Sequence, residues 1–212
     1  MFDTSSIILF LSAAFFVLVV PGPAVIYITT RSLDQGTKAG IVSTIGIAFG
    51  SVIHVGFAAF GLSAILVTSA YAFAIIKFAG AAYLIYLGIT KLFSKTKFDF
   101  EKEKIQKSNS KMFVEGMLVN LLNPKTALFF FSFLPQFADA ANGSIALQIF
   151  ILGMIFVLMG LVSDSLYAIV AGTFQKYILT HPRILNIQKY VTGSIYILLG
   201  AVTALTSGSR TK

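Results

Sequence analysis

Long apolar runs alternate with short polar segments along almost the whole chain. A bilayer core of about 30 Å needs about 20 residues of helix. Six runs reach that length, at about 6–30, 39–66, 70–92, 113–136, 145–172 and 189–207. The pattern predicts an all-α integral membrane protein with six transmembrane helices and no soluble domain.

The first run is interrupted by Pro21, Gly22 and Pro23. The two prolines have no backbone N–H, so the carbonyls of Val17 and Val19 lose their helical partners. An unpaired carbonyl in hydrocarbon costs several kcal/mol, so a break is tolerated only where it is buried or lines a cavity. We therefore expect a broken helix here, with a simple packing kink as the alternative.

The fourth run is interrupted in a similar way at Asn123-Pro124-Lys125. Pro124 releases the carbonyl of Asn120, and the side chains of Asn120 and Asn123 add amide donors and acceptors. Lys125 places a charge inside an apolar span, which is costly enough that a partner or water is expected. The alternative is that Lys125 extends to the membrane surface.

The two halves of the chain resemble one another. Residues 76–88 and 188–200 share a Lys-aromatic pair and a Leu-Gly pair at the same offsets, and a Gly-x-x-x-His motif at 50–54 parallels a Gly-x-x-x-Asp motif at 160–164. Together with the two breaks, these matches indicate a duplication. Three helices per copy is an odd number, so the second copy must be inverted, and inverted repeats with broken helices are typical of secondary transporters.

The expected organisation is a first three-helix repeat at 1–93, a charged linker at 94–112 and a second three-helix repeat at 113–212. Twelve of the sixteen Lys and Arg residues fall on one side of the predicted membrane, half of them in the linker. Because basic loops stay inside the cell, the linker is expected to be cytoplasmic and both termini outside.

Composition supports the membrane assignment and excludes several other classes. Hydrophobic residues make up 57% of the 212 residues and charged residues only 11%, against about 25% charged in soluble domains; the mean hydropathy is +0.87. The net charge is +8, but the basic residues lie between apolar spans without interleaved aromatics, which argues against a nucleic-acid partner. Cysteine is absent, so disulfides and thiolate chemistry are excluded, and no metal or cofactor is expected.

The two breaks together form the candidate substrate site. The half-helix that begins near Ala24 directs its N-terminal amides, with their partial positive charge, toward a substrate carboxylate. The released carbonyls accept from a substrate ammonium, which suits a zwitterion. The candidate substrate-binding residues are Pro21, Gly22, Pro23, Asn120, Asn123, Pro124 and Lys125.

Asp164 and His54 are the candidate proton-coupling residues. Asp164 lies near the middle of the fifth run, where a carboxylate costs about 2.5–3.5 kcal/mol on insertion scales. An apolar environment favours the protonated form of a carboxyl group, which suits proton coupling. A protonated Asp that donates to a backbone carbonyl is the structural alternative. His54 shares a helix face with Gly46 and Gly50 and is either a packing residue that hydrogen-bonds a neighbour or the relay partner of Asp164.

Four motifs occur in order along the chain: Pro-Gly-Pro at 21–23, Tyr-Leu-Ile-Tyr-Leu-Gly at 83–88, Asn-Leu-Leu-Asn-Pro-Lys-Thr-Ala at 120–127, and Ser-Asp-Ser-Leu-Tyr at 163–167. Together they resemble the LysE superfamily of amino-acid exporters, especially its RhtB (homoserine/threonine efflux) branch. The resemblance implies a multi-pass protein of the bacterial inner membrane that exports amino acids or their derivatives, such as homoserine, threonine or leucine-type neutral substrates, by proton antiport. It does not fix the substrate.

Two other functions compete with a transporter. A membrane channel would share the fold, and an intramembrane enzyme could use His54 and Asp164. The chain has no Walker-type loop, no H-E-x-x-H and no G-x-S-x-G motif, so an enzyme is not expected. The small-residue faces at 36–40 and 46–50 are the candidate contacts of a homodimer.

Overall fold

The structure, a computed structural model, describes residues 2–62, 70–93 and 108–174 together with residues 190, 194, 197, 198, 201 and 204. In this part of the chain every regular element is helical. The elements, including π-helical segments η1 and η2 and 3-10 turns η3 and η4, are α1 (Thr4–Val19), α2 (Pro23–Gln35), α3 (Thr37–Gly56), η1 (Phe57–Leu62), α5 (Ala70–Phe93), α6 (Asn109–Leu121), α7 (Pro124–Leu128), η2 (Phe129–Phe133), η3 (Leu134–Phe137), η4 (Ala140–Asn142) and α8 (Ile145–Thr173).

Both predicted breaks are present. α1 and α2 meet at an angle of 47°, and α6 meets the segment Pro124–Phe137 at 50°. The segment Thr37–Gly61, which joins α3 to most of η1, and the helix α8 are each long and apolar enough to cross a membrane. Each bent pair adds one more candidate span, which gives two to four within the described residues. α5 coincides with the predicted third helix, whereas the sixth, at 189–207, lies mostly outside the described residues. The six-helix inverted repeat therefore stays a prediction.

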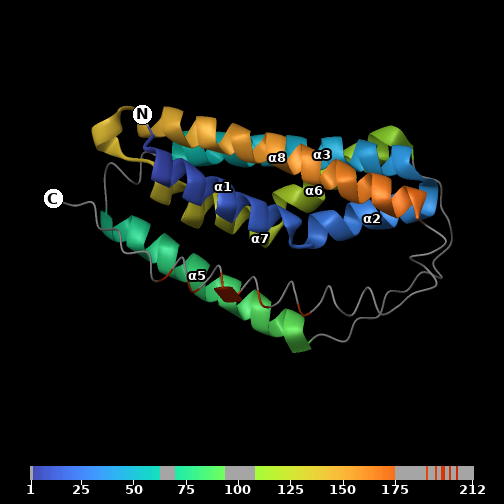
Figure 1. Cartoon of the computed structure of the whole chain (residues 1–212), viewed down its shortest axis with the longest axis horizontal. Coiled ribbons are helices and arrows are strands. Elements are labelled where there is room, and N and C mark those ends of the chain that lie inside the picture. Colours follow the sequence, from blue (N-terminus) through green and yellow to red (C-terminus); the bar gives the residue numbers. More distant parts are fainter. Residues whose placement is uncertain are drawn as a thin grey trace.

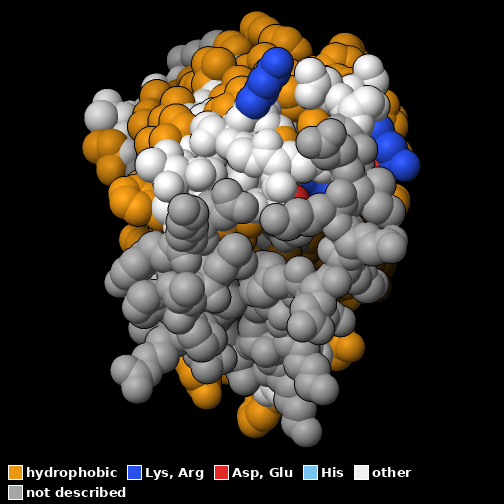
Figure 2. Space-filling model, turned by 90° about the vertical axis from the view of Figure 1, so that its right-hand side faces the viewer, with side chains coloured by type: hydrophobic (Ala, Val, Ile, Leu, Met, Phe, Trp, Pro, Cys, Tyr) orange, Lys and Arg blue, Asp and Glu red, His pale blue; other side chains and the backbone are white. Residues whose placement is uncertain are grey.

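The two broken pairs run in opposite directions. In Figure 1, α1 and α2 follow one another from left to right, whereas α6 and α7 run from right to left, and α3 and α8 lie side by side and antiparallel. α2 ends, and α3 and α6 begin, at the right of the picture, with Arg31, Lys38 and Lys111. We call this the basic end. Figure 2 looks onto it and shows Lys and Arg side chains among polar atoms, with hydrophobic side chains on the flanks.

Glycines allow α3 and α6 to pack with their backbones almost in contact. A Cβ added to Gly46 would lie 2.1 Å from the carbonyl oxygen of Phe113, and one added to Gly116 would lie 2.7 Å from the carbonyl oxygen of Ser43. Gly50 likewise faces the backbone of α6. The face at 46–50 is thus used within the chain and is not available for a homodimer; self-association itself stays a prediction.

The outer surface of the bundle is apolar, as expected for a protein in lipid. Large side chains such as Phe60, Val162 and Leu158 are 81%, 64% and 60% exposed, whereas the opposite stripe of α8 carries buried residues at helical spacing, including Phe156, Gly160 and Asp164. Exposed apolar surface of this extent is not stable in water. The chain is a multi-pass membrane protein.

Two apolar clusters of unequal size lie on either side of the breaks. The larger one draws on α1, the end of α3, η1, η2, η3 and the first half of α8, and lies mainly toward the end opposite the basic end. It contains stacked aromatic rings, with the centroids of Phe129 and Phe156 4.1 Å apart. The smaller cluster, nearer the basic end, has Ile28, Ile47 and Ala168 at its centre.

Candidate functional site

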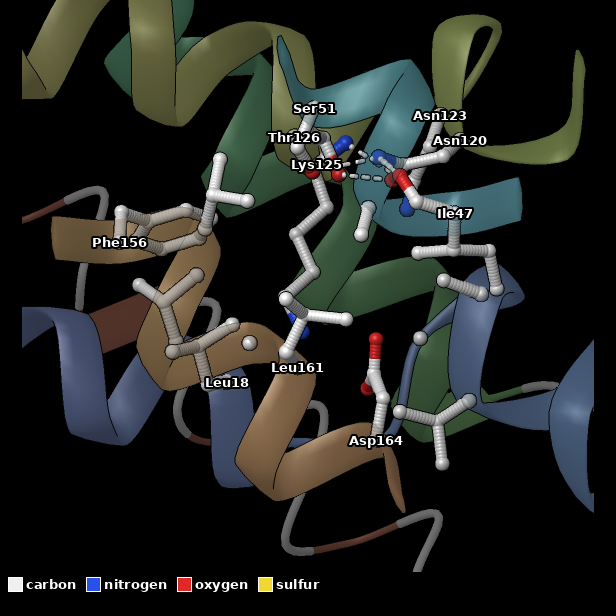
Figure 3. Close-up of a pocket in the computed structure, with 17 residues that line it drawn as sticks. Leu18, Ile47, Ser51, Asn120, Asn123, Lys125, Thr126, Phe156, Leu161 and Asp164 are labelled. Atoms are coloured by element: carbon white, nitrogen blue, oxygen red, sulfur yellow. Dashed lines mark hydrogen bonds between the residues drawn. The ribbon is translucent and has the colours of Figure 1, made fainter. Parts of the chain in front are cut away.

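A cavity of about 40 Å³ lies between the two breaks and α8 (Figure 3). At about 10–15 Å³ per water, it holds about three water molecules. An amino acid has several more non-hydrogen atoms than that, so the cavity must widen to accept one. The described residues that line it are Val17, Leu18, Gly22, Ala24, Val25, Ile47, Ala48, Ser51, Asn120, Asn123, Lys125, Thr126, Phe156, Val157, Gly160, Leu161 and Asp164.

The structure brings most of the predicted site residues together. Those that line the cavity are Gly22, Asn120, Asn123, Lys125 and Asp164. The three prolines shape the breaks without lining it: Pro23 and Pro124 are the first residues of α2 and α7, and Pro21 precedes the Gly22 cap.

Lys125 and Asp164 are the two charged side chains among the described lining residues. They are 9% and 7% exposed, and both point into the cavity in Figure 3. The ammonium of Lys125 donates a hydrogen bond of 2.6 Å to the carbonyl of Val20, the C-cap of α1. Lys125 therefore does not extend to the membrane surface but reaches from the second break to the first. No hydrogen bond to the Asp164 carboxylate occurs among the described residues, and it faces the cavity.

Carbonyls at both breaks accept hydrogen bonds from side chains of other elements. The hydroxyl of Tyr167, in α8, donates to the carbonyl of Val19 at 2.6 Å, which Pro23 releases from the helical ladder. At the second break, the carbonyl of Asn120 lies 3.3 Å from Nε2 of His54. The breaks are thus stabilised by tertiary contacts, as burial in a membrane protein requires.

The side chain of Asn120 is a cross-link rather than an open binding group. Its amide donates to the carbonyl of Ile47 at 2.8 Å and to the hydroxyl of Ser51 at 2.7 Å, and its oxygen accepts from the hydroxyl of Thr126 at 2.8 Å. Both amide hydrogens and one acceptor site are used. Asn120 therefore fixes the end of α6 to α3 and α7 beside the cavity.

Asn123 caps α7. Its side-chain oxygen accepts from the backbone N–H of Lys125 at 3.1 Å, which is the usual role of an Asn that precedes a helix. The amide nitrogen of Asn123 makes no hydrogen bond within the described part of the chain. Asn123 thus has a donor to offer in the cavity, unlike Asn120.

His54 is buried beside the site but does not line the cavity. Its ring stacks on Phe130 with centroids 5.8 Å apart and an interplanar angle of 9°, and it contacts Phe131 edge-on. Nδ1 has no hydrogen-bond partner among the described residues. The structure does not bring His54 and Asp164 together at the cavity, and the relay role of His54 stays a prediction.

Sequence reasoning missed three residues that the site uses. Ser51 and Thr126 line the cavity and hold Asn120, and Tyr167 supports the first break. Ser51 lies one helical turn before His54. Tyr167 lies three residues after Asp164, which places the two on nearly the same face of α8. A search for polar residues on the faces of the two predicted coupling residues would have found Ser51 and Tyr167, and Thr126 lies in the motif at 120–127.

Comparison with known proteins identifies the family of the chain. The family described as LysE type translocator matches residues 15–207. An uncharacterized membrane protein of Bacillus subtilis (strain 168), YrhP, is 31% identical over 94% of this chain and 99% of its own length. Homoserine/homoserine lactone efflux proteins of Salmonella typhimurium and Salmonella typhi are 32% and 31% identical, each over 87% of this chain and 88% of its own length. No solved structure matches the chain.

The matched region includes both breaks, the whole cavity lining and α8. It extends over nearly all of the chain. The chain belongs to the LysE type translocator family.

Proposed function

We propose that this protein is a secondary transporter that exports a neutral amino acid, of the homoserine type, across the bacterial inner membrane in exchange for protons. Membership of a translocator family and the efflux proteins among its relatives support the cargo class. The observation that carries the proposal is the cavity between two oppositely directed broken helices, with Lys125 and Asp164 buried in its wall. Broken helices that meet at a cavity are the usual substrate site of secondary transporters.

In this proposal the cavity widens and holds an amino acid by both of its charged groups. α2 begins at the cavity, where Gly22, Ala24 and Val25 line the wall, so its N-terminal partial positive charge faces the substrate carboxylate. The free amide donor of Asn123 acts on the same group. The substrate ammonium is placed toward Asp164 and the carbonyls of the first break.

Asp164 is proposed to couple export to proton entry. The carboxylate binds the substrate ammonium when it is deprotonated, and protonation from the outside returns the empty carrier. Because a neutral amino acid leaves while a proton enters, each cycle moves one positive charge inward. Both a pH gradient and a negative interior potential would then drive export. His54 is proposed as a secondary participant that acts through the Asn120 carbonyl.

The unequal apolar clusters support an alternating path. With the basic end cytoplasmic, as proposed, the large aromatic cluster closes the cavity toward the outside. Toward the cytoplasm the apolar cluster is smaller. A polar contact lies there, in which the hydroxyl hydrogen of Tyr27 is shared between the Glu115 carboxylate at 3.0 Å and the carbonyl of Met112 at 3.1 Å. We place substrate entry at this contact between α2 and α6. If the predicted six-helix inverted repeat holds, its pseudo-two-fold axis in the membrane plane relates this entry to the exit at the opposite end.

Counterflow in proteoliposomes tests the proposal. Vesicles with the purified protein are loaded with unlabelled homoserine and diluted into labelled homoserine. A carrier accumulates label transiently above equilibrium, because exchange is faster than net loss. Equilibration without overshoot would indicate a channel, and no uptake of any amino acid tested would overturn the proposed cargo.

A further inference from the structure

We propose that Lys125 sets the net charge of the cargo and makes the site selective for net-neutral amino acids over dibasic ones. The inference rests on the proposed function and deepens it. It begins from the fact that Lys125 and Asp164 are the two charged groups among the described residues of the cavity wall. One cation and one anion leave the empty site electrically balanced when Asp164 is ionised.

The charge of Lys125 is held in the cavity by its own hydrogen bond. Its ammonium donates to the carbonyl of Val20 at 2.6 Å, and the side chain is 9% exposed. Because Val20 belongs to the first break and Lys125 to the second, the charge lies between the two elements that are proposed to hold the substrate (Figure 3). The Lys125 ammonium thus occupies the Val20 carbonyl, one of the first-break carbonyls that a substrate ammonium would otherwise use.

The rest of the described wall has no charged side chain to balance another charge. Val17, Leu18, Phe156, Val157 and Leu161 make up much of the lining, and such surfaces do not solvate ions. A zwitterion adds no net charge and leaves the filled site balanced. A dibasic amino acid adds an uncompensated positive charge beside Lys125, which is costly in a membrane interior.

Removal of the lysine charge reverses this balance. With Met at position 125, the filled site carries an uncompensated Asp164 carboxylate unless the cargo brings an extra cation. Homoserine and 2,4-diaminobutyrate form a suitable pair of cargos, because they differ only in a terminal hydroxyl or ammonium group. Replacing homoserine by 2,4-diaminobutyrate leaves the size and shape of the cargo almost unchanged and therefore tests its charge alone.

Asn123→Asp provides a second route to the same prediction. Asp caps a helix as well as Asn does, so the hydrogen bond to the backbone of Lys125 is kept, while the cavity gains a negative charge and Lys125 remains. Lys125→Arg keeps the positive charge and serves as the matched control for Lys125→Met.

The experiment measures homoserine counterflow in proteoliposomes with unlabelled homoserine or 2,4-diaminobutyrate as competitor. Wild type and Lys125→Arg are expected to prefer homoserine by about tenfold or more, and Lys125→Met and Asn123→Asp to shift this ratio toward diaminobutyrate by about tenfold or more. The same ratio can be read from ligand-induced thermal stabilisation of each purified variant, which needs no transport.

Two results would overturn the inference in distinguishable ways. If wild type transports homoserine and the charge variants keep its competitor ratio, the charge rule is wrong while the proposed function stands. If wild type transports no amino acid, the proposed function fails and the charge rule fails with it. A Lys125→Met protein that does not fold leaves Asn123→Asp, with its intact cap, to decide between these outcomes.

Discussion

The hydroxyl of Tyr167 donates a hydrogen bond of 2.6 Å to the backbone carbonyl of Val19, 148 residues earlier in the chain. Pro23 leaves this carbonyl without a helical partner, and Tyr167 is three residues after Asp164. The contact therefore ties the part of α8 that carries Asp164 to the first break. The two halves of the site are aligned by it.

Tyr167→Phe removes this hydrogen bond while it keeps the ring. We expect the free energy of unfolding to fall by about 0.5–2 kcal/mol, and homoserine counterflow to slow because the break is less well fixed to α8. Thermal unfolding of the detergent-purified protein measures the first effect. Tyr71→Phe, at a side chain that is 78% exposed, is the control and should change neither quantity. Equal behaviour of the two variants would show that the Val19 contact contributes nothing.

Gly46→Ala should destabilise the protein strongly, because the new Cβ would lie 2.1 Å from the Phe113 carbonyl oxygen and would push α6 away from α3. Overpacking of this kind costs about 1–3 kcal/mol or more. Gly56→Ala lies on the same helix with nothing within 4 Å of its new Cβ, so it should be neutral or gain up to about 1 kcal/mol from helix propensity. The melting temperatures of the two variants, each compared with that of wild type, measure both effects. A Gly46→Ala protein as stable as Gly56→Ala would rule out the close α3–α6 contact.

The sequence contained most of the fold because apolar length and proline are strong local signals. The runs predicted at 6–30 and 113–136 match the bent pairs, and the run at 145–172 matches α8 to within a residue or so. The second predicted helix, 39–66, begins two residues late, and its residues 57–62 form the π-helical η1, whereas 63–66 lie outside the described residues. No local pattern marks a change from α to π hydrogen bonding, which depends on packing with neighbouring elements.

The sequence could predict which residues belong to the site but not which hydrogen bonds they make. Gly22, Lys125 and Asp164 stand out because a break or a charge inside an apolar run needs a reason. The acceptor of Lys125 at Val20 and the cross-link made by Asn120 depend on how two distant segments pack. Sequence spacing within one helix cannot supply that information. It therefore could not show that the side-chain amide of Asn120 already has three hydrogen-bond partners within the chain.

Asn120→Ala should lower stability more than a loss of contact area alone predicts. It leaves the Ile47 carbonyl and the hydroxyls of Ser51 and Thr126 without the partner that they have in the native structure. Each buried polar group left unpaired costs about 1–3 kcal/mol, so a loss of at least about 2 kcal/mol is expected in a chemical or thermal unfolding assay. The exposed Asn109→Ala on the same helix is the control. A stable Asn120→Ala protein with weakened homoserine binding would instead assign Asn120 to the substrate.

His54→Gln separates packing from proton transfer at this position. Gln keeps a donor that can reach the Asn120 carbonyl but loses the ring that stacks on Phe130. If His54 takes part in coupling, counterflow should persist while transport driven by a pH gradient falls. The ratio of gradient-driven to exchange transport is the measurement. An unchanged ratio, with a lower melting temperature, would leave His54 with a packing role only.

The central claim is that Asp164 couples amino-acid export to protons. Efflux of preloaded labelled homoserine is measured from cells that express wild type, Asp164→Asn or the control Asp34→Asn, with and without a protonophore. Asp34 pairs with Arg31 at 4.0 Å, away from the cavity. We predict that wild type and Asp34→Asn export homoserine until the protonophore is added, and that Asp164→Asn is inactive although it is folded and present in the membrane. Protonophore-sensitive export by Asp164→Asn at the wild-type rate would contradict the account.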